Sequence, residues 1–428
     1  MHESDTSARS TTERSHGDGG EVVAVGPAGL DRRRFVGYVL GGATLVTAAD
    51  LTLGRAPARG AVPSLPQIPE IYDLEDLQTD AALPTSQLIT VTIREDGTAA
   101  FELPRMEVGQ GIVTSTAMIL AEELDLPMRK VEVTLAPARP ELVFNQLTGG
   151  SNTTVSTFTP IRVAAAVARQ QLLEAAAARL GTDADRLSTI SGTVVDAAGN
   201  AIPYGELATD AASQVVKQVG VTLRPREEYR VIGTGRKRTD ARAAVTGQKD
   251  FATDLDVKGA KPTMVCRPPT HRGRPVRLRN RKKILKMKGV THVAQVPTGI
   301  AVRAKTFGQC IDAIRKMDVE WDLGDLAGEN DESILEGLRA AELPMAVPDV
   351  PILAEQVDLG FEFMFRSSAA LEPFAAIADV REDRAEIWAG LKVPILAQQN
   401  IAQALGMSQD QVKVNVVTGG GSFGHKLF

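Results

Sequence analysis

The carboxyl-terminal stretch of this sequence places the tightest constraint on what the chain can fold into. Residues 412–417 are mainly valines separated by polar side chains, and this alternation predicts a strand. Four glycines then fall within the six residues 419–424. Closely spaced glycines let backbone N–H groups approach a ligand and point inward as an anion-binding nest. We therefore expect this loop to hold a large cofactor that carries phosphate or another oxyanion.

Length and composition exclude several other kinds of protein. With 428 residues, 43 % of them hydrophobic, the chain can form two or three domains with cores of their own. A net charge of −5 gives no general reason to expect nucleic-acid binding. Cys266 and Cys310 are too few for a disulfide framework or an iron–sulfur cluster on this chain. The five histidines lack metal-ligand spacing, so we predict no protein-ligated metal site.

The amino-terminal part has the pattern of an export signal. The first thirty residues are polar and are predicted to be disordered. Three arginines at 32–34 precede Phe35, an apolar run to about Ala49 and the small residues 56–58. The apolar run is too short to span a membrane, and the order is that of a twin-arginine signal. We expect export in the folded state to the periplasm or cell envelope; a chance basic cluster before a buried helix is the alternative.

Two further glycine-containing segments precede predicted helices. Gly109, Gln110 and Gly111 stand before residues 112–124, which have helical spacing. Free N–H groups and the positive dipole end of that helix would suit a phosphate or the edge of a pterin, although a plain glycine turn is the alternative. Residues 149–154 likewise either bind an anion or only cap the alanine-rich helix predicted from Pro160 to Leu180.

The sequence also contains an internal similarity. Residues 119–134 align without gaps on residues 400–415, and each stretch comprises a helix end, a short connection and a Val-x-Val strand. A glycine-rich loop follows in both places. Two copies of one supersecondary unit would form related halves around a shared site, and chance similarity is the competing explanation.

The middle of the chain predicts a compact α/β module. Residues 289–293, 300–304 and 319–321 have strand patterns, and a helix is expected from Thr306 to Met317. The basic run from Arg272 to Lys288 has no interleaved aromatic residues, which favours a solvated or partner-docking face over nucleic-acid binding. Residues 231–235 begin like a dinucleotide fingerprint, but Arg238 replaces the third glycine, and we reject a Rossmann motif.

Taken together and in this order, these motifs resemble the molybdopterin-binding large subunit of the xanthine dehydrogenase/aldehyde oxidase family. The resemblance covers about residue 85 to the end and is closest to the bacterial isoquinoline 1-oxidoreductase β-subunit type. Its motifs are the glycine–phenylalanine loop at 419–424, Gly-Gln-Gly at 109–111, the hammerhead entry at 231–256 and Glu372-Pro373.

The resemblance implies an α+β fold in which molybdopterin-binding segments with mixed sheets and helices flank an α/β hammerhead domain. The expected parts are a disordered amino terminus with the signal (1–60), a first molybdopterin-binding segment (61–225), the hammerhead (226–330) and the start of the main molybdopterin-binding domain (331–428). The expected cofactor-binding residues are Gly109, Gln110, Gly111, Gly150, Ser151, Thr153, Gly420, Gly421, Ser422, Phe423 and Gly424.

The chemistry implied by the resemblance is hydroxylation of an N-heteroaromatic or aldehyde carbon with oxygen from water. The implied cofactor is molybdopterin, in its cytosine dinucleotide form, with molybdenum. Electrons would pass to [2Fe–2S] clusters on a small partner subunit and then to an acceptor such as a cytochrome. A non-catalytic envelope protein that binds an anionic ligand through its glycine loops is the alternative from another class.

Three departures from the family pattern qualify this expectation. Lys392 stands where many relatives have a glutamine that bonds an oxo ligand, and the basic run is unusual for a hammerhead. The family's catalytic glutamate lies well beyond the position of Gly424, so the general base is expected beyond Phe428. We therefore expect an incomplete subunit that is inactive alone. The assignment requires that the loops at 109–111 and 419–424 meet in space.

Overall fold

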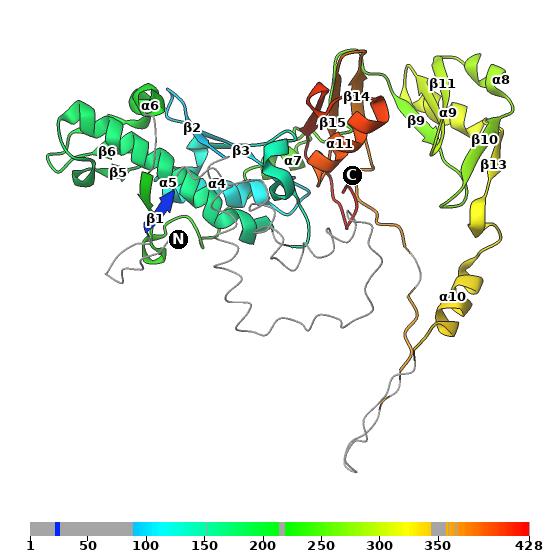
Figure 1. The fold of residues 1–428 in the computed structure, drawn as a ribbon, viewed down its shortest axis with the longest axis horizontal. Coiled ribbons are helices and arrows are strands. Elements are labelled where there is room, and N and C mark those ends of the chain that lie inside the picture. Colours follow the sequence, from blue (N-terminus) through cyan, green and yellow to red (C-terminus); the bar gives the residue numbers. More distant parts are fainter. Residues whose placement is uncertain are drawn as a thin grey trace, which may run out of the picture. The chain divides into compact units, whose positions relative to one another are not determined.

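The computed structural model describes residues 22–25, 89–151, 153–213, 219–343, 357, 359–363 and 366–427 (Figure 1). The chain divides into two compact units, one formed by residues 1–255 and 369–428 and the other by residues 256–368. The predicted twin-arginine signal lies outside the described residues, and the predicted domain boundaries stay predictions. No helix in the described ranges combines the length and hydropathy that a membrane span needs.

The larger unit is built on two copies of one supersecondary arrangement. In the first copy β2 pairs antiparallel with β3, and β3 pairs parallel with β4 across helix α4. In the second copy β14 pairs antiparallel with β15, and β15 pairs parallel with β16 across helix α11. The bounds are β2 Val91–Ile93, β3 Ala99–Leu103, α4 Ile112–Glu123, β4 Val131–Leu135, β14 Ala376–Val380, β15 Ala385–Ala389, α11 Pro394–Leu405 and β16 Val412–Val416.

This arrangement confirms the internal similarity found in the sequence. Residues 131–135 and 412–416, which the alignment matches, are the parallel strands of the two copies. A parallel pair needs a crossover connection, and a helix supplies it in both cases. The copies touch, because Ala138 donates its N–H to Val414 O at 2.8 Å and Ile395 of α11 belongs to the core formed by the first copy.

Helix α5 (Thr153–Leu180) forms the second layer over the first copy. Its small buried side chains, among them Ala164, Ala165 and Ala168, let α4 and α5 pack together. The predicted start at Pro160 is wrong, because the helix begins at Thr153 and Pro160 lies within it. Pro160 is the eighth residue of the helix, where it lacks the N–H that would bond the carbonyl of residue 156, and seven helical residues nevertheless precede it. The predicted end is confirmed, since Gly181 follows with a φ of 65°.

The rest of the larger unit consists of short elements around this core. A three-stranded antiparallel sheet, β5-β6-β7, includes a hairpin of β6 and β7 that turns at residues 196–200. Strand β1 pairs antiparallel with β8. The bounds are β1 Val22–Val25, β5 Ser188–Ile190, β6 Thr193–Val195, β7 Ala201–Pro203, α6 Tyr204–Ser213, β8 Val219–Thr222 and α7 Ala241–Val245.

The smaller unit is the predicted α/β module. An antiparallel sheet in the order β11-β12-β9 and a β10-β13 pair surround a core that includes Ile284, Val302 and Cys310. Helix α9 has Thr306 as its N-cap, whose hydroxyl accepts the Gln309 N–H. The bounds are β9 Thr263–Cys266, β10 Arg274–Leu278, α8 Arg281–Leu285, β11 Val290–Val296, β12 Gly299–Ala304, α9 Phe307–Arg315, β13 Val319–Asp322 and α10 Asp331–Ala340.

The basic run lies on the surface of this module, on β10 and α8. Arg277 and Arg279 are exposed, and both form ion pairs with Glu320 of the neighbouring strand β13. Exposed ion pairs of this kind contribute little to stability. This placement agrees with the predicted solvated face.

Candidate functional site

The glycine loops at 109–111 and 419–424 meet, as the assignment requires. Gly419 donates its backbone N–H to the carbonyl of Glu107 at 2.9 Å, two residues before Gly109. The side chain of Met106 packs where a larger residue would stand, because a Cβ on Gly419 would lie 2.5 Å from Met106 Cε. A side chain at position 419 would require Met106 to shift. The bond between Gly419 and Glu107 confirms the predicted convergence of the two loops.

The third glycine segment begins at the same place. Thr148, directly before Gly149, accepts the Met106 N–H on its hydroxyl at 2.8 Å. The Thr148 N–H in turn donates to Lys392 O at 2.9 Å. The connection that leads into α5 is thus tied both to the Gly-Gln-Gly segment and to the segment after β15. All three predicted cofactor-binding segments start from one region of the larger unit.

The Gly-Gln-Gly loop is held by a buried carboxylate. Glu107, which is 1 % exposed, accepts the N–H groups of Gly109 at 2.8 Å and Gly111 at 3.0 Å, and its other oxygen accepts that of Val113 at 3.2 Å. The Gln110 side chain folds back, accepting from Val108 N and donating to Met106 O. The expectation that these N–H groups are free is wrong, because an internal acid caps the amino terminus of α4.

The loop remains open on its outer side. Gly109 and Gly111 have φ angles of 107° and 86°, which glycine adopts without strain. A Cβ added to Gly109 would meet nothing within 4 Å. A ligand could therefore approach the backbone here, although it would meet carbonyls and the Gln110 side chain rather than a row of free N–H donors.

The carboxyl-terminal loop is built around a second buried carboxylate. Glu372, 6 % exposed, accepts the Gly420 N–H on Oε2 at 2.7 Å and pairs there with the ammonium of Lys426. A Cβ on Gly420 would stand 2.5 Å from Glu372 Cβ, so glycine is required. Glu372 Oε1 is buried and has no partner among the described residues. An unsatisfied buried acceptor is costly, and it marks a place where a ligand N–H or O–H group would fit.

A second lysine braces the same loop. Lys392, 8 % exposed, donates from Nζ to the Ser422 hydroxyl at 3.2 Å, and that hydroxyl donates to His425 O at 2.6 Å. Burial lowers the pKa of the Lys392 amine. Phe423 has a φ of 49° and a side chain that is 72 % exposed. The predicted Ser422 is thus a structural part of the loop, whereas Phe423 projects outward, where it can cover a bulky ligand.

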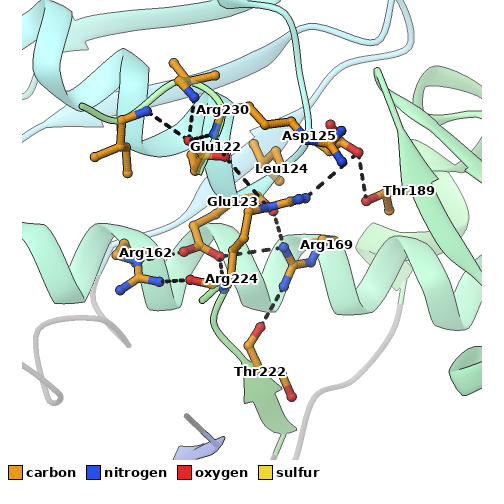
Figure 2. Close-up of polar contacts among 12 residues, drawn as sticks. Glu122, Glu123, Leu124, Asp125, Arg162, Arg169, Thr189, Thr222, Arg224 and Arg230 are labelled. Carbon is orange, nitrogen blue, oxygen red and sulfur yellow. Dashed lines mark hydrogen bonds and ion pairs between the residues drawn. The ribbon is translucent and has the colours of Figure 1, made fainter. Parts of the chain in front are cut away.

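A strap, residues 222–240, runs along α4 and is fixed at that helix's carboxyl end. Figure 2 shows Glu122 and Glu123 there, between α5 and the strap. Glu122 accepts the backbone N–H groups of three successive strap residues, Arg230, Val231 and Ile232, at 2.7–3.1 Å.

The neighbouring Glu123 joins the strap to α5. Its Oε1 accepts from Arg162 at 2.6 Å and its Oε2 from the Arg224 N–H at 3.1 Å. The guanidinium groups of Arg162 and Arg169 donate in turn to the carbonyls of Arg224 and Thr222 (Figure 2). Both acids are almost fully buried and both have several donors, as buried carboxylates require.

The far end of the strap reaches the Gly-Gln-Gly loop. The Thr239 N–H donates to the Thr114 hydroxyl at 3.0 Å. Arg238 donates to Gly109 O at 2.7 Å and contacts Glu107 at 3.4 Å, and Asp240 holds its guanidinium in place. The bond to Arg238 keeps the pKa of the Asp240 carboxyl well below its usual range. Residues 231–235 lie within this strap, which confirms that they form no Rossmann motif.

Sequence reasoning missed several of the residues that shape the site. Glu107 stands two positions before Gly109, and Lys426 stands two positions after Gly424. A charged residue that close to a glycine loop is the signal that would have suggested both. The position of Arg238 gave no such signal, because it lies 129 residues from its partner Gly109 in the sequence.

Three features of the site remain available to a ligand. They are the exposed backbone at Gly109, the unpaired Glu372 Oε1 and the exposed aromatic ring at Phe423. Within the described residues, no three His, Cys, Asp or Glu side chains are grouped so as to hold a metal ion. The exposed backbone, the unpaired carboxylate oxygen and the aromatic ring fit an organic cofactor.

Glycine loops that meet on two copies of one supersecondary unit define a cofactor-binding α+β protein. Comparison with known families specifies the cofactor, because residues 71–252 and residues 354–428 each match a molybdopterin cofactor-binding domain. The two matches together cover more than half of the chain. The chain belongs to the xanthine dehydrogenase/aldehyde oxidase family of molybdopterin-binding oxidoreductase subunits, as the sequence motifs predict.

Three curated relatives show the same likeness. The β-subunit of isoquinoline 1-oxidoreductase from Brevundimonas diminuta is 28 % identical in an alignment that covers 82 % of this chain and 52 % of that protein. A nicotinate dehydrogenase subunit from Pseudomonas putida is 26 % identical over 78 % of this chain and 29 % of that protein. Membrane-bound aldehyde dehydrogenase of Gluconacetobacter polyoxogenes is 27 % identical over 79 % of this chain and 47 % of that protein. The chain spans about half, or less, of the length of these relatives.

Proposed function

We propose that this chain is the molybdopterin-binding part of a molybdenum hydroxylase large subunit that acts on an N-heteroaromatic or aldehyde carbon. The observation that carries the proposal is the bond from Gly419 N–H to Glu107 O, which joins the glycine loops of the two cofactor-domain segments. When bound, the molybdenum cofactor would supply the oxidation of an electron-poor carbon with oxygen from water. The relatives' names supply the substrate classes.

The chain's own residues would bind and orient that cofactor. Glu107 and Arg238 fix the shape of the Gly-Gln-Gly loop, so that little reorganisation accompanies binding. Glu372 Oε1, beside Gly420, would accept a hydrogen bond from an amino or ring N–H group of the ligand. The exposed ring of Phe423 would cover the bound ligand and exclude water.

Several finer features belong to the same proposal. The cofactor would be the cytosine dinucleotide form, and electrons would leave through [2Fe–2S] clusters on a small partner subunit to an acceptor such as a cytochrome. Cys266 and Cys310, two thiols in the smaller unit, are too few to ligate such a cluster, which supports a separate subunit. The arginines at 32–34 support export of the folded protein by the twin-arginine route to the periplasm or envelope.

The test is the cofactor content of the natural complex, purified from a strain that makes molybdenum cofactor. We expect about one molybdenum atom and one oxidisable pterin per chain, measured by elemental mass spectrometry and by fluorescence of the released pterin. A preparation that lacks both, yet binds inorganic phosphate saturably, would refute the enzyme assignment and support the anion-binding alternative.

A further inference from the structure

Positive charge is concentrated in one part of the smaller unit. Residues 257–317 contain sixteen lysines and arginines and a single acid, Asp312, although the whole chain has a net charge of −5. Like charges at close range repel one another and destabilise the compact state. Charge asymmetry of this size between parts of one chain is typical of a surface that binds an anionic partner.

Helices α8 and α9 form a layer over one face of the sheet β11-β12-β9, and we call the pair the helical layer. Both helices contribute buried side chains to the core beneath that face. The pair is tied at both ends. Asn280, before α8, donates to Lys316 O, after α9, at 2.7 Å, and the Lys305 N–H donates to Gly289 O at 3.0 Å. The helices therefore lie side by side in opposite directions, and their exposed side chains share one outer surface.

The lysines of this layer have no counter-charge within the described residues. No ion pair there includes four exposed lysines on or just after α8, namely Lys282, Lys283, Lys286 and Lys288. The arginines of the neighbouring strand β10 differ, because Arg277 and Arg279 both pair with Glu320. The smaller unit thus neutralises its basic strand internally and leaves the charge of its basic helix to an outside partner.

Exposed apolar side chains accompany these lysines. Phe307 and Ile311 stand one turn apart on α9 and are 55 % and 36 % exposed. Lys305 precedes them, and Arg315 follows one turn after Ile311; both cations are exposed. Apolar rings flanked by cations suit a lipid interface, where the ring enters the head-group region and the cations meet lipid phosphates.

We propose that the helical layer binds the surface of an anionic lipid bilayer. The four unpaired lysines would contact the phosphate groups of anionic lipids, and Phe307 with Ile311 would enter the interface. A duplex nucleic acid or an acidic protein segment would engage the lysines without burying the ring in hydrocarbon, so Phe307 separates these partners from lipid. The inference concerns the smaller unit alone, and it does not rest on the proposed function.

The first experiment measures co-sedimentation of the full chain with vesicles of phosphatidylcholine, made with or without phosphatidylglycerol. We expect the wild type to bind the phosphatidylglycerol vesicles at least about tenfold more tightly than the neutral ones. Sodium chloride should release the protein, because salt screens the attraction. Equal binding to the two kinds of vesicle would overturn the inference.

Neutralising lysines of α8 tests where the charge acts. The triple variant should bind phosphatidylglycerol vesicles at least about thirtyfold more weakly than the wild type; it combines Lys282→Gln, Lys283→Gln and Lys286→Gln. The matched control removes three exposed cations of the larger unit that also lack a described ion pair, and it should bind within about twofold of the wild type. It combines Arg226→Gln, Lys237→Gln and Arg242→Gln. Equal losses in the two variants would show an effect of net charge alone and would overturn the inference.

A charge-keeping variant guards against misfolding. Arginine at the same three positions, as Lys282→Arg, Lys283→Arg and Lys286→Arg, should bind vesicles as the wild type does. Fluorescence of Trp321 in β13, measured in a Trp388→Phe background, reports whether the smaller unit is folded in each protein. A folded arginine variant that binds as weakly as the glutamine variant would refute the role of charge.

The second experiment identifies the partner. Phe307→Ala should bind phosphatidylglycerol vesicles at least about threefold more weakly than the wild type, because a ring is lost from the interface. Its weak binding to duplex DNA and to polyglutamate should be unchanged. Unaltered vesicle binding by Phe307→Ala would overturn the proposal. So would tighter binding to DNA or polyglutamate than to vesicles, if it depends on the three lysines but not on Phe307, since the layer would then serve a nucleic acid or an acidic protein.

Discussion

Replacing Glu122 with alanine should release the strap from the carboxyl end of α4. In the wild type this carboxylate, 2 % exposed, accepts the backbone N–H groups of Arg230, Val231 and Ile232. Alanine removes the acceptor from three successive donors in one step. The strap would then be held at this end mainly through Glu123.

The size of the effect follows from these contacts. A hydrogen bond to a charged group contributes about 1.5–3 kcal/mol to stability. The three bonds cannot simply be added, because they share one carboxylate, and the exposed residue Arg230 can bond water instead. Removal of one member of a buried charged network typically costs about 3–5 kcal/mol. We therefore expect Glu122→Ala to lower the free energy of unfolding of the larger unit by about 3 kcal/mol.

The assay is urea unfolding followed by tryptophan fluorescence in a Trp321→Phe background. Of the two tryptophans, Trp321 lies in the smaller unit, so Trp388 of β15 then reports on the larger unit alone. Hydrogen exchange should also show faster exchange in the strap and in the Gly-Gln-Gly loop, because Arg238 links the two.

The control is Glu132→Ala, which removes a half-exposed partner of Arg94 and should leave stability almost unchanged. A loss below about 1 kcal/mol in Glu122→Ala, or unaltered exchange in the strap, would refute the view that Glu122 anchors it.

Two further predictions concern the carboxyl-terminal loop. Gly420→Ala places a Cβ 2.5 Å from Glu372 Cβ, so it should destabilise the larger unit by about 1–3 kcal/mol. The control is Gly235→Ala, whose Cβ would meet nothing within 4 Å and which should not destabilise the unit. Equal unfolding midpoints for the two variants would contradict the overlap. Burial lowers the pKa of Lys392 below its ordinary value of 10.5. At a pH between the lowered pKa and 10.5, the unfolded chain binds more protons than the folded protein. The stability of the wild type should therefore rise relative to that of Lys392→Gln as the pH approaches 10.5. Unfolding midpoints of the two proteins between pH 7 and 10.5 test this, and a difference that does not change with pH would refute it.

Patterns within short stretches of sequence determined much of the architecture. Alternation at residues 412–417 predicted strand β16, and the match between residues 119–134 and 400–415 predicted a repeated unit of helix end, connection and strand. The structure adds an antiparallel partner strand to each copy. Glycine spacing marked the loops that meet. These features depend on side-chain periodicity and on the backbone freedom of glycine, which are properties of neighbouring residues.

Only the tertiary structure decided how those loops are held. The Gly-Gln-Gly N–H groups were expected to be free, but the side chain of Glu107 folds back onto them. Arg238 and Gly109 are 129 residues apart, and Glu372 and Gly420 are 48 apart, yet each pair forms a hydrogen bond. Which buried carboxylate meets which donor depends on how distant segments pack, and local periodicity carries no information about that choice.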